Sequence, residues 1–480
     1  MPEFTGPRAE GENLGIAYID AALRRSQCAD VILVNRTGDK TNEEILSHVA
    51  EFQPHMVGIG LTSHRLVPSL LQLSNQIKHI HHCSVIAGGH YLMFRGEFLM
   101  QQELALDAVV LGEGEETIVD IAEAAQRNLS WAHIPGLLVR EGDRIVRTAI
   151  RTKPLDLDSL AFPTREPGLR VYNVSASRGC YTTCSFCSVP QFTRASPGKP
   201  FRLRTPASVR GELSHLHSIG ATAISFVDDV FLLPGDKGLN RAMSIADIMH
   251  DLRLKWAFSC RTPELTEAIV AYCKPRGLCN IGLGLESGSG DVLIRFSKRA
   301  SLEHSRRAIA LCREYNISIQ PYFIMFEPDM SLGDISANIS FLDEFGLLWP
   351  SYAGNSLDPH PGTPAFEYLH KQSRLIDRGH AFAPIYLDEA VKALRKLIRP
   401  ALQQARVVEL SLRRQQFEAE IAIDDESTRL NLKRAIDTRL AQVSHYTAEF
   451  LRDAINGEYG ATKFLDNVAA VGREYPSQSI

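Results

Sequence analysis

The chain has 480 residues, of which 44% are apolar and 22% are charged, and its formal net charge is -4. This length allows two or three domains, and the composition is ordinary for a soluble globular protein. The slight acidic balance, without a basic run interleaved with aromatic residues, argues against nucleic acid as a partner. No stretch approaches about 20 apolar residues and the first residues lack the apolar core of a signal peptide, so we expect a cytoplasmic protein without a membrane segment.

Residues 1–153 are predicted to form a doubly wound, Rossmann-like α/β domain, because short apolar runs alternate with helical patterns. The predicted strands lie at 29–35, 56–63, 83–90 and 107–115, and two of the predicted helices lie at 42–52 and about 67–80. Glycines follow these strands at the edge where doubly wound sheets bind ligands, at Gly88, Gly89, Gly112 and Gly114. They indicate either close approach of a ligand or simply tight turns.

The end of this domain reads as a β-hairpin followed by a linker. The segment I-P-G-L-L-V-R-E-G-D-R-I-V-R-T places Gly142 and Asp143 in its turn. A proline-bearing stretch from Pro154 to Pro167 then separates the first domain from the next.

The most specific motif is S-R-G-C-Y-T-T-C-S-F-C, which places Cys180, Cys184 and Cys187 within eight residues. A structural zinc site needs four ligands, so this loop is one short. Three thiolates suit a [4Fe-4S] cluster that keeps one iron open to a small molecule. The alternatives are a zinc site with a distant fourth ligand, or buried thiols that fall together by chance.

This C-x-x-x-C-x-x-C spacing, with Phe186 just before the last cysteine, resembles the radical S-adenosylmethionine (SAM) superfamily. The resemblance implies that the open iron chelates the amino and carboxylate groups of SAM. It further implies that reductive cleavage yields a 5′-deoxyadenosyl radical, which takes a hydrogen atom from substrate. The protein would then hold SAM and exclude water.

Residues 169–380 are predicted to form the partial (β/α)6 TIM-type barrel of that superfamily. After the strand V-Y-N-V-S-A-S, which delivers the cysteine loop, predicted strands recur at 223–229, 255–261, 280–287, 317–326 and 349–356. Active residues on such barrels lie at the carboxyl ends of the strands, and polar residues gather at these ends here.

The resemblance assigns roles to residues that end the second and third strands. Asp228 and Asp229 would contact the amino group or ribose of SAM, and a helix N-cap pair is the alternative. Arg261 could pair with the SAM carboxylate. Cys260 beside it is a candidate hydrogen-atom donor, with a plain packed thiol as the alternative.

Further cofactor contacts are implied along the fourth and fifth strands. Glu286 matches the family glutamate that accepts hydrogen bonds from ribose hydroxyls, and the following helix resembles one that carries a lysine in many relatives, so that Lys298 either caps this helix or takes part in the chemistry. Gln320 and Phe326 lie along the fifth strand, near an adenine pocket in which Phe326 and Glu327 replace small residues. The segment from Asp358 to Pro364 closes the sixth strand and lies over the substrate or forms a rigid turn.

The first domain resembles the cobalamin-binding domain that precedes the cluster domain in many radical SAM enzymes. The likeness rests on the helix from Leu14 to Arg24, on G-G-H-Y and on G-E-G-E-E-T. Two features depart from that family. The polar residues before Leu14 leave no room for the usual first strand, and the D-x-H-x-x-G motif is absent, since His55 with Gly58 gives only a partial match that we interpret as a surface histidine. Cobalamin is therefore a possible cofactor rather than a necessary one.

Residues 381–480 have helical periodicity, with breaks predicted at Pro400 and at 424–428. This helical region could form a lid, select substrate or form the face of a homo-oligomer. The six cysteines outside the loop are interpreted as buried thiols, at Cys28, Cys83, Cys260, Cys273, Cys279 and Cys312.

Two enzymatic hypotheses follow. In the first, the radical acts directly on a small polar metabolite, for example in the dehydration or rearrangement of an aminosugar-type natural-product intermediate. In the second, cobalamin carries a methyl group from SAM to an unactivated carbon. A non-catalytic iron–sulfur electron carrier is a distant third. Either enzyme needs a low-potential electron donor such as a flavodoxin or ferredoxin.

Overall fold

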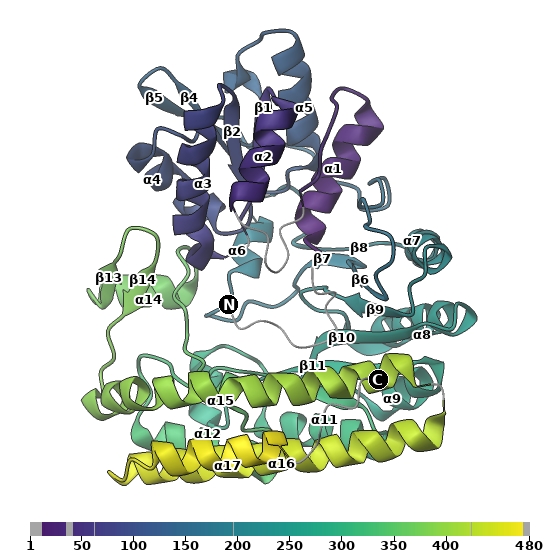
Figure 1. The fold of residues 1–480 in the computed structure, drawn as a ribbon, viewed down its shortest axis with the longest axis vertical. Coiled ribbons are helices and arrows are strands. Elements are labelled where there is room, and N and C mark those ends of the chain that lie inside the picture. The colour runs from purple at the N-terminus through teal and green to yellow at the C-terminus, as the bar shows by residue number, and fades with distance from the viewer. Residues whose placement is uncertain (1–11, 35–41, 62, 195, 424, 474–480) are drawn as a thin grey trace.

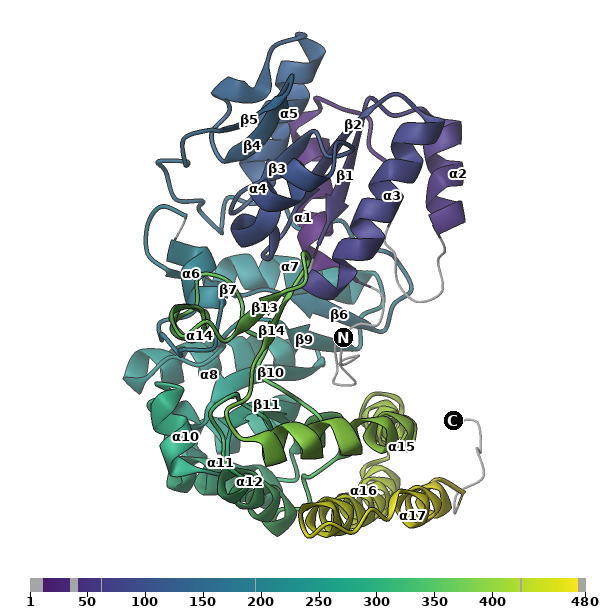
Figure 2. The same cartoon turned by 90° about the vertical axis from the view of Figure 1, so that its left-hand side faces the viewer.

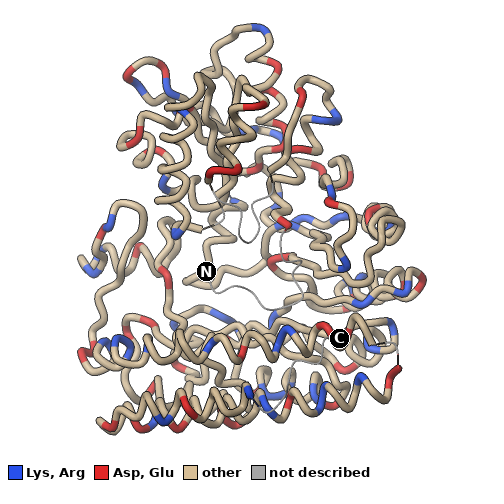
Figure 3. The backbone as a smooth tube through the Cα atoms, in the orientation of Figure 1, with Lys and Arg blue, Asp and Glu red and all other residues tan. Residues whose placement is uncertain are grey.

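The structure is a computed structural model that describes residues 12–34, 42–61, 63–194, 196–423 and 425–473. An N-terminal α/β domain lies at one end of the molecule, a parallel sheet occupies the middle, and long C-terminal helices lie at the other end (Figures 1 and 2). Basic and acidic residues are interspersed along all three parts (Figure 3). In the described ranges, no helix has the length and apolar character needed to cross a bilayer.

The N-terminal sheet is mixed. Three neighbouring strands are parallel, and the predicted hairpin continues the sheet in the antiparallel sense. In order across the sheet, the strands are β1 (Met56–Gly60), β2 (Ser84–Gly88), β3 (Ala108–Val110), β4 (Leu137–Glu141) and β5 (Arg144–Arg147).

Helices cover both faces of this sheet, because side chains on a strand alternate between its faces. Val85 and Ala87 of β2 belong to a core cluster with α2 (Asn42–Phe52), α3 (Val67–Ile80) and α4 (Leu92–Gln102). Ile86 points the other way, into a cluster with α1 (Leu14–Ser26) and α5 (Glu115–Gln126). The predicted doubly wound domain is confirmed, and so are the helices at 42–52 and 67–80.

The predicted strand at 29–35 is wrong in its described part, 29–34, which is irregular. Side chains rather than a neighbouring strand satisfy its carbonyl groups. Within the segment, Arg24 Nη2 donates to Val31 O over 2.9 Å, and just before it Gln126 Nε2 donates to Cys28 O. The polar residues before Leu14, where the usual first strand was expected to be missing, lie almost wholly outside the described residues. Of them, Asn13 caps α1 by accepting from Gly15 N at 3.1 Å.

The central sheet holds five parallel strands in spatial order β6, β9, β10, β11, β12. Their bounds are β6 (Val171–Val174), β9 (Ala223–Phe226), β10 (Lys255–Arg261), β11 (Leu278–Glu286) and β12 (Ser318–Phe323). The helices that follow or lie between them are α7 (Pro206–Ser218), α8 (Gly235–Asp251), α9 (Glu267–Cys273), α10 (Gly290–Arg295), α11 (Leu302–Glu314) and α12 (Leu332–Glu344).

The predicted sixth strand at 349–356 is wrong. Its place is taken by the short helix α13 (Pro350–Ala353) and a single parallel bridge between Phe326 and Ser356. Pro350 suits the first position of a helix, and Glu409 in α15 (Glu389–Ala422) accepts a hydrogen bond from Ser351 N at 2.8 Å. A contact distant in sequence therefore holds this segment as a helix.

The predicted break at Pro400 is also wrong, since α15 continues through it. A proline inside a helix costs roughly 3 kcal/mol. Here the neighbouring turns bury Ile398, Ala401 and Leu402 against the rest of the protein, which offsets that cost. The predicted break near 424–428 is confirmed in its described part, because α16 (Glu426–Ile455) begins after the Asp425 cap. The chain ends in α17 (Ala461–Arg473).

The C-terminal helices pack against the β12 side of the central sheet. Helix α13 contacts β12, α15 contacts α13, and α16 contacts α12. One hydrophobic core runs from the central sheet into these helices. The roles of these helices as a lid, in substrate selection and in oligomer formation stay predictions.

The remaining elements are short. The strand pairs are β7 (Ser177–Gly179) with β8 (Phe201–Leu203), and β13 (Leu375–Asp377) with β14 (Phe382–Pro384). The helices are α6 (Val189–Arg194) and α14 (Pro364–Lys371), with 3-10 turns η1 (His64–Leu66), η2 (Trp131–His133), η3 (Thr262–Glu264) and η4 (Lys274–Arg276).

Candidate functional site

The three motif cysteines lie on one loop between β7 and α6. The turn closes where Cys187 N donates to Cys184 O at 3.1 Å, and Cys180 Sγ lies 3.1 Å from Thr182 Oγ1. Burial, with smaller contributions from the neighbouring Cys184 and Cys180, raises the pKa of the Cys187 thiol to about 12. All three thiols are free of disulfides. Three neighbouring free thiols on one tight loop are a donor set that fits a [4Fe-4S] cluster with one open iron.

Asp228 and Asp229 hold the base of this loop. Ser177 Oγ and Ala176 N both donate to the Asp228 carboxylate, and Gly179 N donates to Asp229 Oδ2 at 3.1 Å. Burial raises the pKa of Asp228 to about 6. These contacts give both aspartates a positioning role next to Cys180. Their predicted contact with SAM stays a prediction.

Gly179 immediately precedes the first cysteine and has a φ of +88°. A Cβ at this position would overlap the carbonyl oxygen of Pro200. In Gly179→Ala the β7–β8 pair must move, and the loop it carries moves with it. We expect this variant to retain less than about half of the iron of the wild type after anaerobic reconstitution, measured as iron per chain. Gly168→Ala, with a similar φ of +88° but open space around it, is the matched control and should keep its iron.

Arg261 ends β10 with a buried guanidinium that is only partly used. Its Nη2 donates to Lys298 O at 2.7 Å and to Arg299 O at 3.1 Å, and its Nε lies 3.4 Å from Glu264 Oε2. Its Nη1 is buried and has no partner among the described residues. Buried polar groups are normally paired, so this donor fits an anionic group of a ligand such as the SAM carboxylate.

Glu286 ends β11 in the left-handed region, at a φ of +64°, which is uncommon for a residue other than glycine. Lys298 Nζ donates to Glu286 Oε1 at 2.6 Å, and both side chains are buried. Burial alone would lower the pKa of Lys298, but the Glu286 carboxylate raises it above its ordinary value. Gly284 makes room for the pair, since a Cβ there would lie 2.7 Å from Lys298 Nζ. A strained, charged residue at a strand end is typical of a functional site.

Cys260 points away from this site. On β10 it shares a face with Trp256 and Phe258 in the main core, whereas Arg261 and Ser259 alternate to the other face. Burial raises the pKa of its thiol well above the ordinary value, and the nearby Cys312 raises it further. This placement favours the packed-thiol alternative over a hydrogen-atom donor. The other five cysteines outside the loop are buried too, as expected.

The remaining predicted residues are placed as follows. Phe186 packs edge-to-face on Phe296, with ring centroids 5.0 Å apart. Gln320 is buried on β12, in register with Gly282 of β11. Phe326 is fully buried beyond the end of β12, in the bridge to Ser356. None of these placements tests a contact with SAM. His55 is exposed, as predicted for a surface histidine.

The carboxyl edge of the N-terminal sheet faces the cysteine loop. Arg178 of β7 pairs with Glu113 at 2.9 Å and with Glu115, both in the segment that follows β3. Arg202 of β8 pairs with the same Glu113 at 2.7 Å. Both carboxylates lie in the G-E-G-E motif. The ion pairs of this motif therefore join the first domain to strands β7 and β8 beside the cysteine loop.

A second contact lies at the end of β2. His90 stacks on Phe192 of α6, with ring centroids 4.5 Å apart, and burial lowers the pKa of His90 to about 4. Close backbone packing also accounts for one of the predicted glycines: Gly89 has a φ of +124°, and a Cβ there would overlap the carbonyl oxygen of Leu61. Contact between these glycines and a ligand stays a prediction.

A three-thiol loop on a parallel sheet, faced by the carboxyl edge of a doubly wound domain, defines a radical SAM protein with an N-terminal cofactor domain. The family models agree with this class. Residues 7–122 match the B12 binding domain, and residues 174–342 match the radical SAM superfamily. The chain is a radical SAM enzyme whose cluster domain follows a B12-binding domain. Its cofactors are SAM and a [4Fe-4S] cluster, and the B12-binding domain supports cobalamin as well.

Several curated proteins are similar to this chain. An uncharacterized methyltransferase of Pyrococcus horikoshii is 27% identical over 380 residues, which are 76% of this chain and 80% of that protein. The hopanoid C-3 methylase of Methylococcus capsulatus is 25% identical over 78% of this chain and 73% of its own length. The 4'-phospho-dehydrooxetanocin synthase of Priestia megaterium is 22% identical over 93% of this chain, but over only 63% of its own length.

Solved structures share the fold. The cobalamin-dependent S-adenosylmethionine radical enzyme OxsB, with aqua-cobalamin and S-adenosylmethionine bound, matches with a TM-score of 0.73 and 17% identity. The match covers 97% of this chain and 73% of that one. The radical S-adenosylmethionine methyltransferase TsrM of Kitasatospora setae matches with a TM-score of 0.62 and 17% identity, over 76% of this chain and 74% of its own.

Two contacts of the site, and the position of His64 beside it, were not predicted from the sequence. The pairing of Lys298 with Glu286 joins residues 12 apart through a turn that the sequence pattern does not define. Arg178 was visible within the cysteine motif and the glutamates within G-E-G-E, but nothing in either motif indicates that the two meet. His64 follows the β1 strand at its carboxyl end, and this position was a signal that could have identified it.

Proposed function

We propose that this chain is a cobalamin-dependent radical SAM methyltransferase that methylates an unactivated carbon of a small polar natural-product intermediate. The observation that carries the proposal is the match of residues 7–122 to the B12 binding domain, in a chain where Glu113 and Glu115 of that domain pair with the strand leading into the cysteine loop. Two of the similar proteins are named as a methyltransferase and a methylase, which supports the second hypothesis over the first.

The residues of this chain divide the work as follows. Cys180, Cys184 and Cys187 would hold the cluster, which supplies the electron that cleaves SAM. The Nη1 of Arg261 would bind the SAM carboxylate, and the Glu286 carboxylate would accept from the ribose hydroxyls. The carboxyl edge of the N-terminal sheet would hold cobalamin, which carries the methyl group. Docking of the two domains would exclude water from the space between these groups.

Direct radical chemistry without methyl transfer is the second candidate. It is favoured by the likeness to the 4'-phospho-dehydrooxetanocin synthase, which covers 93% of this chain, C-terminal helices included, whereas the two methylase-type matches cover 76% and 78%. In this case the radical would act on the same class of polar metabolite. Both candidates require a low-potential electron donor such as a flavodoxin or ferredoxin, and a homo-oligomer is compatible with either.

The deciding experiment counts the products of SAM. The reconstituted, reduced protein is incubated anaerobically with SAM, with and without hydroxocobalamin, and 5′-deoxyadenosine and S-adenosylhomocysteine are measured by mass spectrometry. We expect both products, with S-adenosylhomocysteine formed only when cobalamin is present. Deoxyadenosine alone, unaffected by cobalamin, would reject the methyltransferase in favour of the direct radical enzyme. A Cys184→Ala control should form no deoxyadenosine while still binding hydroxocobalamin.

A further inference from the structure

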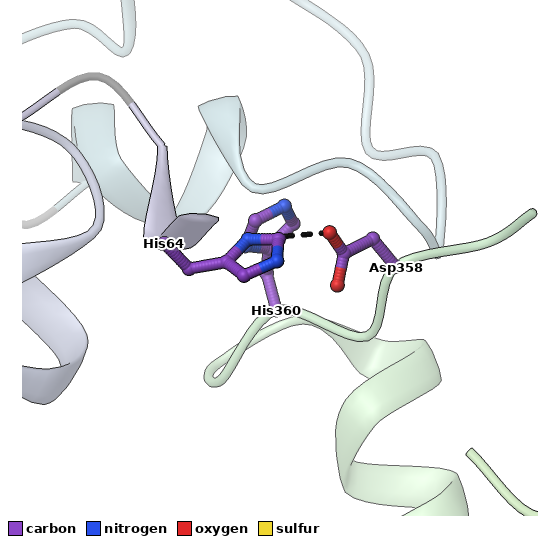
Figure 4. A group of neighbouring side chains, drawn as sticks. All are labelled: His64, Asp358 and His360. Carbon is purple, nitrogen blue, oxygen red and sulfur yellow. Dashed lines mark ion pairs between the residues drawn. The ribbon is translucent and has the colours of Figure 1, made fainter. Parts of the chain in front are cut away.

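His64, Asp358 and His360 converge in the space between the two α/β domains (Figure 4). His64 opens the 3-10 turn η1 just beyond β1 of the N-terminal domain. Asp358 and His360 lie in the D-P-H-P-G-T-P segment that leads into α14 on the side of the central sheet. The three side chains are therefore brought together by the docking of two domains and by nothing local in the sequence.

The donor atoms of the three side chains lie at most slightly farther from one another than the ligands of a bound metal ion would. His64 Nδ1 lies 3.2 Å from Asp358 Oδ2, and one donor atom from each residue lies within 4.8 Å of the others. Donors bound at about 2.1 Å to a tetrahedral ion are roughly 3.4 Å apart, so the two imidazoles need only small side-chain rotations to close on one ion. The two imidazole rings are 5.9 Å apart and nearly perpendicular, which lets both direct a nitrogen toward a common point.

The chemistry of the donors fits as well. The side chain of His64 is only 11% exposed, and the imidazole nitrogen of histidine is the commonest side-chain ligand of metals. The Asp358 carboxylate is partly exposed and supplies the single negative charge. The surroundings hold both histidine rings in place, since the ring of Tyr91 lies 5.7 Å from that of His64 and 6.1 Å from that of His360.

We propose that His64, Asp358 and His360 bind one divalent first-row transition-metal ion, separate from the cluster, that ties the N-terminal domain to the central domain. Two imidazoles and one carboxylate are a ligand set that such ions favour, and they leave coordination positions for water. The Tyr91 hydroxyl, which donates to His380 O at 2.7 Å, and the pair between Arg95 and Asp377 at 2.7 Å hold the same two parts of the chain together beside the site. His64 lies beyond the carboxyl end of β1, at the sheet edge where the proposed methyltransferase would hold cobalamin, so the proposed ion would lie beside that cofactor.

Zinc is the probe, because Zn²⁺ binds such donors tightly and adds no colour to the cluster spectrum. The reconstituted holoenzyme, whose loop thiols are occupied by the cluster, is equilibrated with Zn²⁺, dialysed, and analysed for zinc and iron per chain by mass spectrometry. We expect one zinc per chain in the wild type. His64→Ala and His360→Ala should each weaken zinc binding by about 10-fold or more without changing the iron content.

The matched control is His380→Ala, which removes a neighbouring histidine that lies outside the triad and should leave zinc binding unchanged. Because His64 and His360 lie in different domains, a folding defect in one variant leaves the other as a test, and iron content with the circular dichroism spectrum reports folding in both. Absence of stoichiometric zinc in the wild type, or equal binding in both triad variants and His380→Ala, would overturn the proposal and leave an ordinary His–Asp pair. A His64→Ala variant that alters the spectrum of bound hydroxocobalamin but binds zinc normally would also overturn it, and would assign the histidine to the corrin.

Discussion

Cys184→Ala is expected to lose the cluster and with it the ability to cleave SAM. Cys184 is the buried middle thiol of the loop, between Cys180 and Cys187. Loss of one of three thiolates leaves two donors for a cluster that needs at least three. Removing a partner beyond the ligands usually costs 10- to 100-fold in metal affinity or activity, so loss of a ligand itself should reduce deoxyadenosine formation by more than about 100-fold.

Iron per chain, the broad visible absorption and deoxyadenosine formation are the three measurements. Cys28→Ala is the control, because Cys28 is a buried thiol of the N-terminal domain and is not part of the loop. It changes the number of thiols equally and should keep iron and activity. A Cys184→Ala protein with full iron content would contradict the assignment of the cluster to this loop and would point to other ligands.

The local sequence pattern was sufficient to predict an element wherever the residues of that element determine both its periodicity and its ends. The helix at 42–52 follows its apolar spacing, and the hairpin of β4 and β5 turns at Gly142 and Asp143 as its sequence predicts. The cysteine loop belongs to the same group, because its spacing alone states which residues lie close together. Such signals do not depend on the rest of the chain.

The prediction of secondary structure failed where contacts with residues distant in the sequence determine the conformation. The segment 29–34 has the composition of a strand, yet Arg24 binds the carbonyl of Val31, and Gln126 binds that of Cys28 just before the segment, in place of a neighbouring strand. The segment 349–356 was expected to complete the barrel, but Glu409 of α15, 58 residues beyond Ser351, accepts a hydrogen bond from Ser351 N and holds the segment as α13. Neither partner can be identified from the segment it controls.

At the site, the alternation of side chains between the two faces of β10 indicates which residues of this strand are packed in the core. Trp256, Phe258 and Cys260 share one parity on β10, and the two aromatic residues mark that parity as the core face. Arg261 has the opposite parity, and its Nη1 has no hydrogen-bond partner in the part of the chain that the structure describes. Because every second residue of a strand points to the same face, the position of Cys260 relative to Trp256 favours a packed thiol. In contrast, the partner of Arg261 cannot be read from the strand at all.

The buried pair of Glu286 and Lys298 leads to the second large effect, on stability. Lys298→Met removes the cation and leaves the Glu286 carboxylate buried without its partner, which typically costs 3–5 kcal/mol when a buried ion pair is broken from one side. We expect the free energy of unfolding of the central domain to fall by about that amount in denaturant titrations. Glu286→Gln should be destabilising for the converse reason, since Lys298 then keeps a buried charge.

The double variant Glu286→Gln/Lys298→Met separates packing from ligand binding. With both charges removed, most of the lost stability should return, because a neutral pair of similar volume replaces the ion pair. Affinity for SAM should not return with it. A hydrogen bond to a charged group contributes about 1.5–3 kcal/mol, so loss of the carboxylate that would accept from the ribose should weaken SAM binding roughly 10- to 100-fold.

SAM affinity is measured on the iron-loaded protein by equilibrium binding, and Arg306→Met serves as the control because its pair with Glu344 is exposed and should matter little for either property. Recovery of both stability and SAM affinity in the double variant would show that Glu286 serves only to neutralise Lys298. Recovery of stability alone would explain the left-handed backbone at Glu286, at φ +64°, because strain at a strand end persists where it directs a charged group toward a ligand.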